Sequence, residues 1–421
     1  MPVEKIETLI IGAGQSGLAL SHHLRRRGAE HLILERGEVA ERWSSERWDS
    51  LHFQSPNWNM NLPGWPRQVA DPQADPHAFS ALGEVTDYLV RYAATIGAPI
   101  RTRCAVRALT SKPGADRFHV HADGMLYEAR NVVVATGPYH TPRPAPSLDA
   151  AEVLELHSTQ YRRPAQLPEG AVLVVGSGNS GVQIAEELCG AGRRVFLSVS
   201  SHERVRRRYR GKDCIWWLIA TGAADATWND RTGTTLSRLM TGAGGGHDID
   251  LRALAAAGVV LLGRVAAIEA GRVALADDLR DHLARGDASL AAFEQRCDAV
   301  ALAHGWDLPS PSPVRRLPDP AEVRTPLRTL SLAKERITAV VWANGAQSDF
   351  DWIDVPVFGT GPKRRPVHRR GASPVRGLYF LGLPWLHKWK SAFLFGADED
   401  AEHIADCIGA DRETCGRAAP T

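Results

Sequence analysis

Two glycine-rich segments of the same form could each hold the pyrophosphate of a dinucleotide. In a G-x-G-x-x-G segment, the first glycine makes a tight turn, the second lets the backbone approach the pyrophosphate, and the third packs a helix against a strand. Two such segments predict two dinucleotides in one chain, and electron transfer between them is the chemical reason to hold both. The residues are Gly12, Gly14, Gln15, Ser16 and Gly17 in the first segment and Gly176, Gly178, Asn179, Ser180 and Gly181 in the second.

Each segment has the strand–turn–helix setting that the motif needs. A β-branched apolar run precedes each one, and helix-like stretches follow at 18–27 and 182–189. A pyrophosphate bound there would lie on the exposed N–H groups at the helix N-terminus.

The residue that ends the next strand distinguishes the two cofactors. Glu35 ends the run 31–34, where its carboxylate would accept a hydrogen bond from a ribose 2′-OH and repel a 2′-phosphate. The first unit should therefore bind FAD or NAD. In the second unit the corresponding position falls at Ser198, Val199 or Ser200, and no acid occurs there.

An arginine-rich run follows that position in the second unit. Guanidinium groups pair well with phosphate oxygens, so the run predicts a site for the 2′-phosphate of NADPH. The alternative is that the arginines form a solvated basic surface. The candidates are Arg204 with one or more of Arg206, Arg207 and Arg208, together with Ser200.

Two further apolar strands end in small residues. The first ends in Ala135, Thr136 and Gly137, and the second ends in Asn344 and Gly345. Paired strands of this kind return the chain between domains in flavoproteins with two dinucleotides, which favours FAD in the first unit. Either strand alone would be explained as an ordinary buried strand.

Composition narrows the class of protein. With 421 residues, 44% of them apolar, the chain can form two or three domains, and a net charge of +2 gives no electrostatic case for nucleic acid. No apolar run approaches the roughly 18 residues that span a bilayer. The chain enters its first strand almost at once, so we expect no signal peptide, and six cysteines without a C-x-x-C pair indicate reduced cytoplasmic thiols rather than a metal site or redox dithiol.

These elements predict an α/β protein with two dinucleotide-binding (Rossmann-like) domains, the NADPH domain being inserted into the FAD domain. Asp250 should cap a short helix, a pair of inserted helices is expected between 276 and 306, and a C-terminal helix over 391–408. The expected boundaries are 1–145 for the first part of the FAD domain, 146–164 for a linker, 165–340 for the NADPH domain with a helical insertion at about 215–330, and 341–421 for the return.

Taken together, nearly the whole chain resembles the bacterial flavin-containing monooxygenases, which are class B flavoprotein monooxygenases. Their identifying motif, F-x-G-x-x-x-H-x-x-x-[YWF], falls at 151–161, where His157 and Tyr161 are kept while Ala151 and Val153 replace Phe and Gly. Baeyer–Villiger enzymes usually carry Trp at the aromatic position, so Tyr161 favours oxygenation of nitrogen or sulfur. His157 is expected to link domains.

The resemblance implies a reaction scheme. NADPH reduces FAD, O2 adds at flavin C4a, NADP⁺ stays bound and shields the peroxyflavin from water, and an amine or sulfide of a small molecule takes the distal oxygen. A Baeyer–Villiger ketone monooxygenase stays open, as does an NADPH-dependent flavin reductase or redox-sensing flavoprotein. The substrate is not specified, and a homodimer stays open.

The resemblance also places residues around the flavin. The family segment that runs past the flavin ring carries an asparagine two residues before a proline. Gln54 holds that place before Pro56, so Gln54 is the candidate carboxamide and Ser55 the second choice. The alternative for the nearby tryptophans is that they fill the interdomain core. Further candidate cofactor contacts are Arg36, Arg42, Trp43, Trp48, Val106, Lys390 and Ser391.

Overall fold

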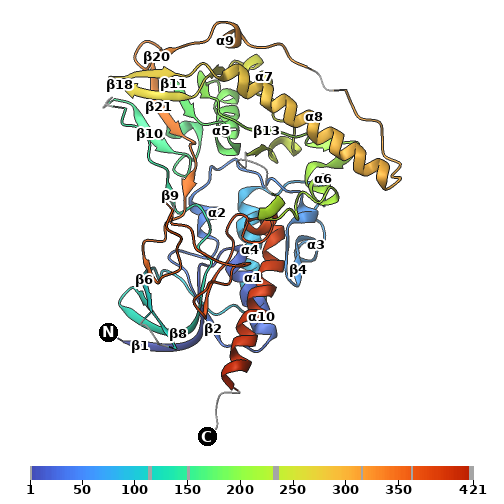
Figure 1. Ribbon diagram of the computed structural model, residues 1–421. Helices are drawn as coiled ribbons and strands as arrows, with labels where there is room; N and C mark the ends of the chain where they lie inside the picture. The colour runs from blue at the N-terminus through green and yellow to red at the C-terminus, as the bar shows by residue number, and fades with distance from the viewer. Residues whose placement is uncertain are drawn as a thin grey trace.

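The computed structural model describes residues 2–111, 116–148, 152–230, 237–313, 316–361 and 364–416. Two α/β units lie one above the other, each built on a sheet with parallel strands at its centre (Figure 1). The fold class predicted from the sequence is confirmed. Ala151, the first residue of the family motif, lies outside the described residues.

The first unit is built on an eight-stranded sheet in the order β23-β6-β7-β8-β1-β2-β5, with β24 paired to β8. β1 runs parallel to β2 and β8, whereas β6, β7 and β8 form an antiparallel meander. The strands are β1 (Val3–Ile11), β2 (His31–Leu34), β5 (Ile100–Arg101), β6 (Val106–Ser111), β7 (Phe118–Ala122), β8 (Met125–Val134), β23 (Ile353–Asp354) and β24 (Leu378–Phe380).

Helices from both ends of the chain cover this sheet. α1 (Gln15–Arg26) and α10 (Ala397–Gly416) lie side by side, so the C-terminal segment returns to the first unit (Figure 1). Leu18 of α1 and Ile404 of α10 are buried in the same core. The unit also holds α2 (Glu41–Ser45), η1 (Asn57–Asn59), β3 (Asn61–Leu62), β4 (Trp65–Pro66), α3 (Arg67–Ala70) and α4 (Leu82–Thr95).

The second unit is built on a five-stranded parallel sheet in the order β10-β21-β11-β12-β17. Its strands are almost continuously apolar, as expected where both faces of a parallel sheet are covered. The elements are β10 (Leu154–His157), β11 (Ala171–Val175), α5 (Asn179–Gly190), β12 (Val195–Ser198), α7 (Leu251–Ala256), β17 (Val260–Leu262) and β21 (Ile337–Trp342). Asp250 caps α7, as predicted, by accepting a hydrogen bond of 2.9 Å from Arg252 N.

The inserted region differs from the expectation. One continuous helix, α8 (Leu279–Ala303), replaces the expected pair, because Gly286 does not break the helix but lets it approach His202, whose Nε2 lies 2.8 Å from the place a Cβ would take. The region is also not wholly helical, since β17 belongs to the main sheet. The three strands β18 (Val265–Glu269), β19 (Arg272–Leu275) and β20 (Thr329–Ser331) form a small antiparallel sheet.

The C-terminal helix also begins later than expected, at Ala397. Two 3₁₀ turns precede it because Phe393 is extended, with φ −92° and ψ 159°, and this interrupts the helical path. The remaining short elements are β9 (Thr141–Pro142), η2 (Pro164–Gln166), β13 (Glu203–Arg204), β14 (Arg208–Tyr209), β15 (Lys212–Asp213), α6 (Cys214–Ala220), η3 (Trp228–Asp230), β16 (Arg238–Leu239), η4 (Ala243–Gly245), α9 (Ala321–Arg324), β22 (Ala346–Gln347), η5 (Trp389–Ala392) and η6 (Leu394–Gly396).

Candidate cofactor and active site

The first glycine segment has the backbone of a dinucleotide cradle. Gly12 adopts φ +114°, and a Cβ there would lie 2.6 Å from the carbonyl oxygen of Ala135. A Cβ on Gly17 would overlap the carbonyl oxygen of Gly12, so helix and strand touch at this point. By contrast, nothing within 4 Å would meet a Cβ on Gly14. Space is therefore open at the one glycine that a pyrophosphate should approach.

The second glycine segment repeats this geometry. Gly176 adopts φ +110°, a Cβ there would lie 2.5 Å from the carbonyl oxygen of Ala343, and a Cβ on Gly181 would overlap Gly176. At Gly178 a Cβ would make only an ordinary contact, 3.5 Å from Ser237 Oγ. The two units are thus built alike at the residues that approach phosphate.

Two buried polar atoms flank the cradles. Among the described residues, Thr136 Oγ1 and Asn344 Oδ1 are buried without a hydrogen-bond partner. Each follows the small residue that packs on the first glycine of its own unit. Because a buried polar atom without a partner is costly, both atoms fit a site that a bound group completes.

Glu35 stands at the ribose position of the first unit. Its carboxylate accepts hydrogen bonds from Ala13 N at 2.8 Å and from Gly37 N at 3.0 Å, and the residue is 9% exposed. A carboxylate has about four lone-pair sites, so two remain for ribose hydroxyls. The side chain is held where the sequence predicts an acceptor.

Two of the predicted arginine contacts share one carboxylate. Arg36 and Arg42 each donate to Glu46 at 2.8 Å, and Arg42 also donates to the carbonyl oxygens of Tyr139 and His140. Burial lowers the pKa of Arg42. Arg42 therefore ties α2 to the segment that follows Gly137, whereas Arg36 is half-exposed.

The C-terminal segment lies over the first glycine segment. Gln15 accepts a hydrogen bond from Trp43 Nε1 at 3.2 Å and donates one to the carbonyl oxygen of Ala392 at 3.3 Å. Beside it, Ser391 Oγ accepts from the backbone N–H of Lys388 at 3.0 Å. Lys390 forms an ion pair with Asp225 at 2.8 Å. The predicted flavin contacts at both ends of the chain therefore converge on one place.

Gln54 joins the two units. Its side-chain oxygen lies 3.5 Å from Asn179 Nδ2, at the N-terminus of α5 in the second glycine segment. Asn179 is itself oriented, because its Oδ1 accepts a hydrogen bond of 2.8 Å from Met240 N. Ser55, the second candidate, is buried. The residue predicted beside the flavin thus contacts the segment predicted to bind the nicotinamide coenzyme.

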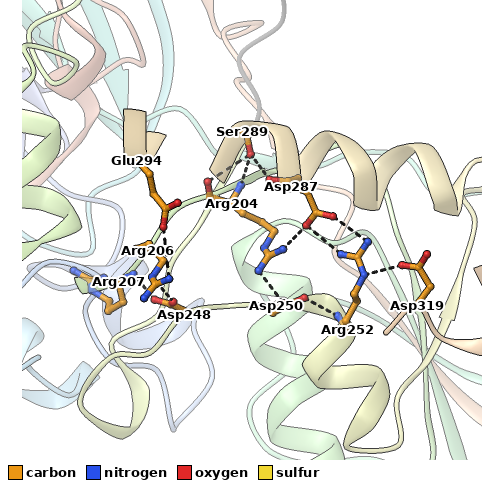
Figure 2. Close-up of polar contacts among 11 residues, drawn as sticks. Arg204, Arg206, Arg207, Asp248, Asp250, Arg252, Asp287, Ser289, Glu294 and Asp319 are labelled. Carbon is orange, nitrogen blue, oxygen red and sulfur yellow. Dashed lines mark hydrogen bonds and ion pairs between the residues drawn. The ribbon is translucent and has the colours of Figure 1, made fainter. Parts of the chain in front are cut away.

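The arginine run has carboxylate partners, as Figure 2 shows. Arg204 lies 2.8 Å from Asp250 and 2.5 Å from Asp287, and its side chain is 9% exposed. Arg207 forms a two-bond pair with Asp213. These two arginines are therefore buried and paired, whereas Arg208 is exposed and donates to the carbonyl oxygens of Gly245 and Gly246. The assignment of these two arginines and Ser200 to a coenzyme phosphate stays a prediction, and Ser200 itself accepts a hydrogen bond from Ser177 Oγ at its backbone oxygen.

Two other predicted contacts, Trp48 and Val106, differ in burial. Trp48 is buried in the core of the second unit, which matches the alternative that some tryptophans fill the interdomain region. Val106 is half-buried at the start of β6. Their roles toward a cofactor stay predictions.

The kept residues of the family motif act as links. His157 Nε2 lies 3.1 Å from the carbonyl oxygen of Gly345, and burial lowers the pKa of His157. Tyr161 is fully buried and donates to Glu187 at 2.6 Å, while Ser50 of the first unit donates to the same carboxylate at 2.7 Å.

Sequence reasoning missed the acidic partners of these cationic and phenolic groups. Glu46, Glu187, Asp213 and Asp287 are distributed over both units with no shared spacing. Glu187 and Asp287 are brought to their partners by long-range packing. Glu46 lies four residues after Arg42 and Asp213 six residues after Arg207, so these two pairings are local. The local pattern that identified the glycines carried no signal for them.

Several kinds of site are absent from the part of the chain that the structure describes. It contains no group of three or more histidine, cysteine or acidic side chains arranged to hold a metal. Five cysteines there form no disulfide, namely Cys104, Cys189, Cys214, Cys297 and Cys407. None of its helices has the length and apolar character required to span a membrane.

Comparison with known proteins agrees with this geometry. The pyridine nucleotide-disulphide oxidoreductase family matches residues 9–218, which include both glycine segments. Over these residues, about half of its length, the chain is similar to that family. It is 29% identical over 407 residues to a CzcO-like oxidoreductase of Geobacillus kaustophilus, covering 96% of this chain and 98% of the relative.

Two further relatives extend the comparison. Indole-3-pyruvate monooxygenase YUCCA1 of Oryza sativa is 27% identical over 324 residues, covering 72% of this chain and 77% of the relative. A flavin-containing monooxygenase from Stenotrophomonas maltophilia has the same fold, with a TM-score of 0.65, 21% identity, and coverage of 97% of this chain and 99% of that one. These similarities identify the chain as an oxidoreductase.

Proposed function

We propose that this protein is an FAD- and NADPH-dependent monooxygenase that oxygenates an amine nitrogen or a sulfide sulfur of a small molecule. The observation that carries the proposal is the contact between Gln54 and Asn179. It brings the predicted flavin segment to the second glycine segment, so two dinucleotides bound in the two cradles would meet there. The monooxygenase relatives support the same reading.

The residues of each unit would hold the cofactors. FAD would lie along Gly14, with Glu35 accepting from its ribose and Thr136 supplying a hydroxyl. The coenzyme would lie along Gly178, with Asn344 in the place corresponding to Thr136. When bound, FAD would take a hydride from NADPH and activate O2 for transfer of one oxygen atom.

The protein's own contribution is positioning and exclusion of water. Asn179, fixed by Met240 N, orients the side-chain oxygen of Gln54. Trp389 packs in one buried cluster with Met240, the residue that holds Asn179, and Phe393 and Phe395 pack against this cluster. Apolar surroundings of this kind would suit a small, uncharged nucleophile and a dry site.

An isotope experiment tests the proposal. Purified protein with FAD and NADPH is incubated under ¹⁸O2 with a panel of thioethers, tertiary amines and cyclic ketones, and products are examined by mass spectrometry. We expect one ¹⁸O atom in a sulfoxide or N-oxide. Label only in an ester or lactone would indicate a Baeyer–Villiger enzyme. NADPH oxidation that yields peroxide with every substrate would indicate a flavin reductase.

A further inference from the structure

Arg207 uses its guanidinium to connect the two units. Nε and Nη2 donate to the carboxylate of Asp213 at 2.9 and 2.5 Å, whereas Nη1 donates to the carbonyl oxygen of Gln54 at 2.9 Å and lies 3.5 Å from that of Thr241. The guanidinium carbon also lies 4.6 Å from the ring centre of Phe79. One side chain thus contacts the first unit at Gln54 and Phe79 and the second unit at Asp213 and Thr241.

The surroundings keep this side chain in place. Arg207 is 2% exposed, and its backbone N–H donates to Asp248 at 2.5 Å. The backbone of the second unit also touches the first unit at Gly242, next to Thr241. A Cβ on Gly242 would overlap the carbonyl oxygen of Phe53 and lie 2.9 Å from Phe79 Cβ. Leaving this position to reach a phosphate would abandon a buried carboxylate, which is costly.

We propose that Arg207 is a positioning residue that fixes the backbone of Gln54 and so holds the Gln54 carboxamide against Asn179. The proposal rests on the proposed function, because it assigns to Arg207 the geometry of the cofactor junction. It differs from the sequence-based expectation, in which Arg207 contacts the coenzyme phosphate. The planar guanidinium group of arginine, with its donors in fixed directions, can bind Asp213 and Gln54 at the same time. A lysine could not reach both in this geometry.

The test compares Arg207→Met with Arg252→Met. Arg252 is a matched control because its side chain is 6% exposed and pairs with Asp287 and Asp319, within the second unit (Figure 2). Both variants should melt at a lower temperature. Only Arg207→Met should raise the peroxide released per NADPH, roughly threefold or more, and weaken the change that NADP⁺ causes in the absorbance of bound FAD. NADH- and NADPH-driven turnover should change alike.

Two further variants keep the result decisive. If Arg207→Met fails to fold, Arg207→Lys retains the charge beside Asp213 and should show the same loss of coupling. In the double variant Gln54→Ala with Arg207→Met, peroxide release should equal that of Gln54→Ala alone, since both changes act on one group.

Other outcomes separate the proposals. Suppose that the unsubstituted protein binds FAD and oxygenates its substrate. If both Arg207 variants then release no more peroxide per NADPH than this protein does, the positioning role of Arg207 is wrong but the proposed function stands. If the Arg207 variants lost turnover with NADPH but not with NADH, Arg207 would instead contact the 2′-phosphate of the coenzyme. Unsubstituted protein that binds no FAD would overturn both this inference and the proposed function.

Discussion

Tyr161, which is fully buried, donates a hydrogen bond of 2.6 Å to the half-buried Glu187 and so joins the linker to α5. Burial and the adjacent carboxylate raise the pKa of Tyr161, so the phenol stays protonated and donates. Ser50 binds the other oxygen of Glu187, which brings the first unit to the same carboxylate. The aromatic residue of the family motif is thus an anchor for the domain interface.

Tyr161→Phe should lower stability without changing the chemistry. The variant removes one donor to a charged acceptor, which costs about 1.5–3 kcal/mol. We expect a lower free energy of unfolding in urea and an unchanged ratio of peroxide to NADPH. A shift from sulfur oxygenation to ketone oxygenation in this variant would show instead that the aromatic position selects the reaction.

Gly14→Val should yield folded protein that lacks FAD. The structure leaves open space at the Cβ position, and Gly14 has φ −85° and ψ −175°, a conformation that any residue adopts. The valine should therefore obstruct only a bound pyrophosphate. Flavin content per chain and circular dichroism provide the measurement.

Gly17→Ala is the contrasting variant for this test. Its Cβ would overlap the backbone of Gly12, so it should impair folding itself. If Gly14→Val still bound a full complement of flavin, the assignment of FAD to the first glycine segment would be wrong.

Arg204→Ala should destabilise the protein, by about 3 kcal/mol, because Asp250 loses its buried partner and Asp287 keeps only Arg252. The ion pairs favour this structural role, so the Michaelis constants for NADPH and NADH should change by similar factors. A rise confined to NADPH would instead support the predicted phosphate contact. Both constants and the melting temperature are measured on the same preparation.

Stability should fall as the solution is made acidic. Burial lowers the pKa of His31 and of His202, so both are neutral in the folded protein. His31 donates from Nδ1 to the carbonyl oxygen of Ala29 and accepts from Ser21 at Nε2. The unfolded chain binds protons at these groups below its pKa of about 6.5. Their contribution is therefore complete above that pH and is lost as the pH falls below it.

Urea unfolding at several pH values between 7.5 and 5 measures this loss. His31→Gln, which keeps polar atoms but does not titrate, should show a shallower decline than the unsubstituted protein. Parallel curves would contradict the assignment.

Much of the fold follows from local pattern. Glycines that need positive φ at Gly12 and Gly176, placed after apolar runs, predicted both cradles and the helices α1 and α5. The sequence did not predict that α8 continues through Gly286. This glycine does not form a turn but allows the helix to pack closely against His202. Asp287 could not be predicted either, because only tertiary packing brings it to Arg204, 83 residues away. Asp213 lies six residues after Arg207 and meets it at the β14–β15 hairpin, but the charge pattern did not reveal this pairing and indicated a phosphate site.

We infer that oxygen chemistry takes place where Gln54 meets Asn179. The most direct measurement is the peroxide released per NADPH by Gln54→Ala, with Gln68→Ala as a control that loses only a hydrogen bond to Ala74 within the first unit. We expect intact flavin reduction, a nearly unchanged melting curve, more peroxide and less oxygenated product in Gln54→Ala alone. Unaltered peroxide and product yields, or a loss of stability with unaltered coupling, would contradict it.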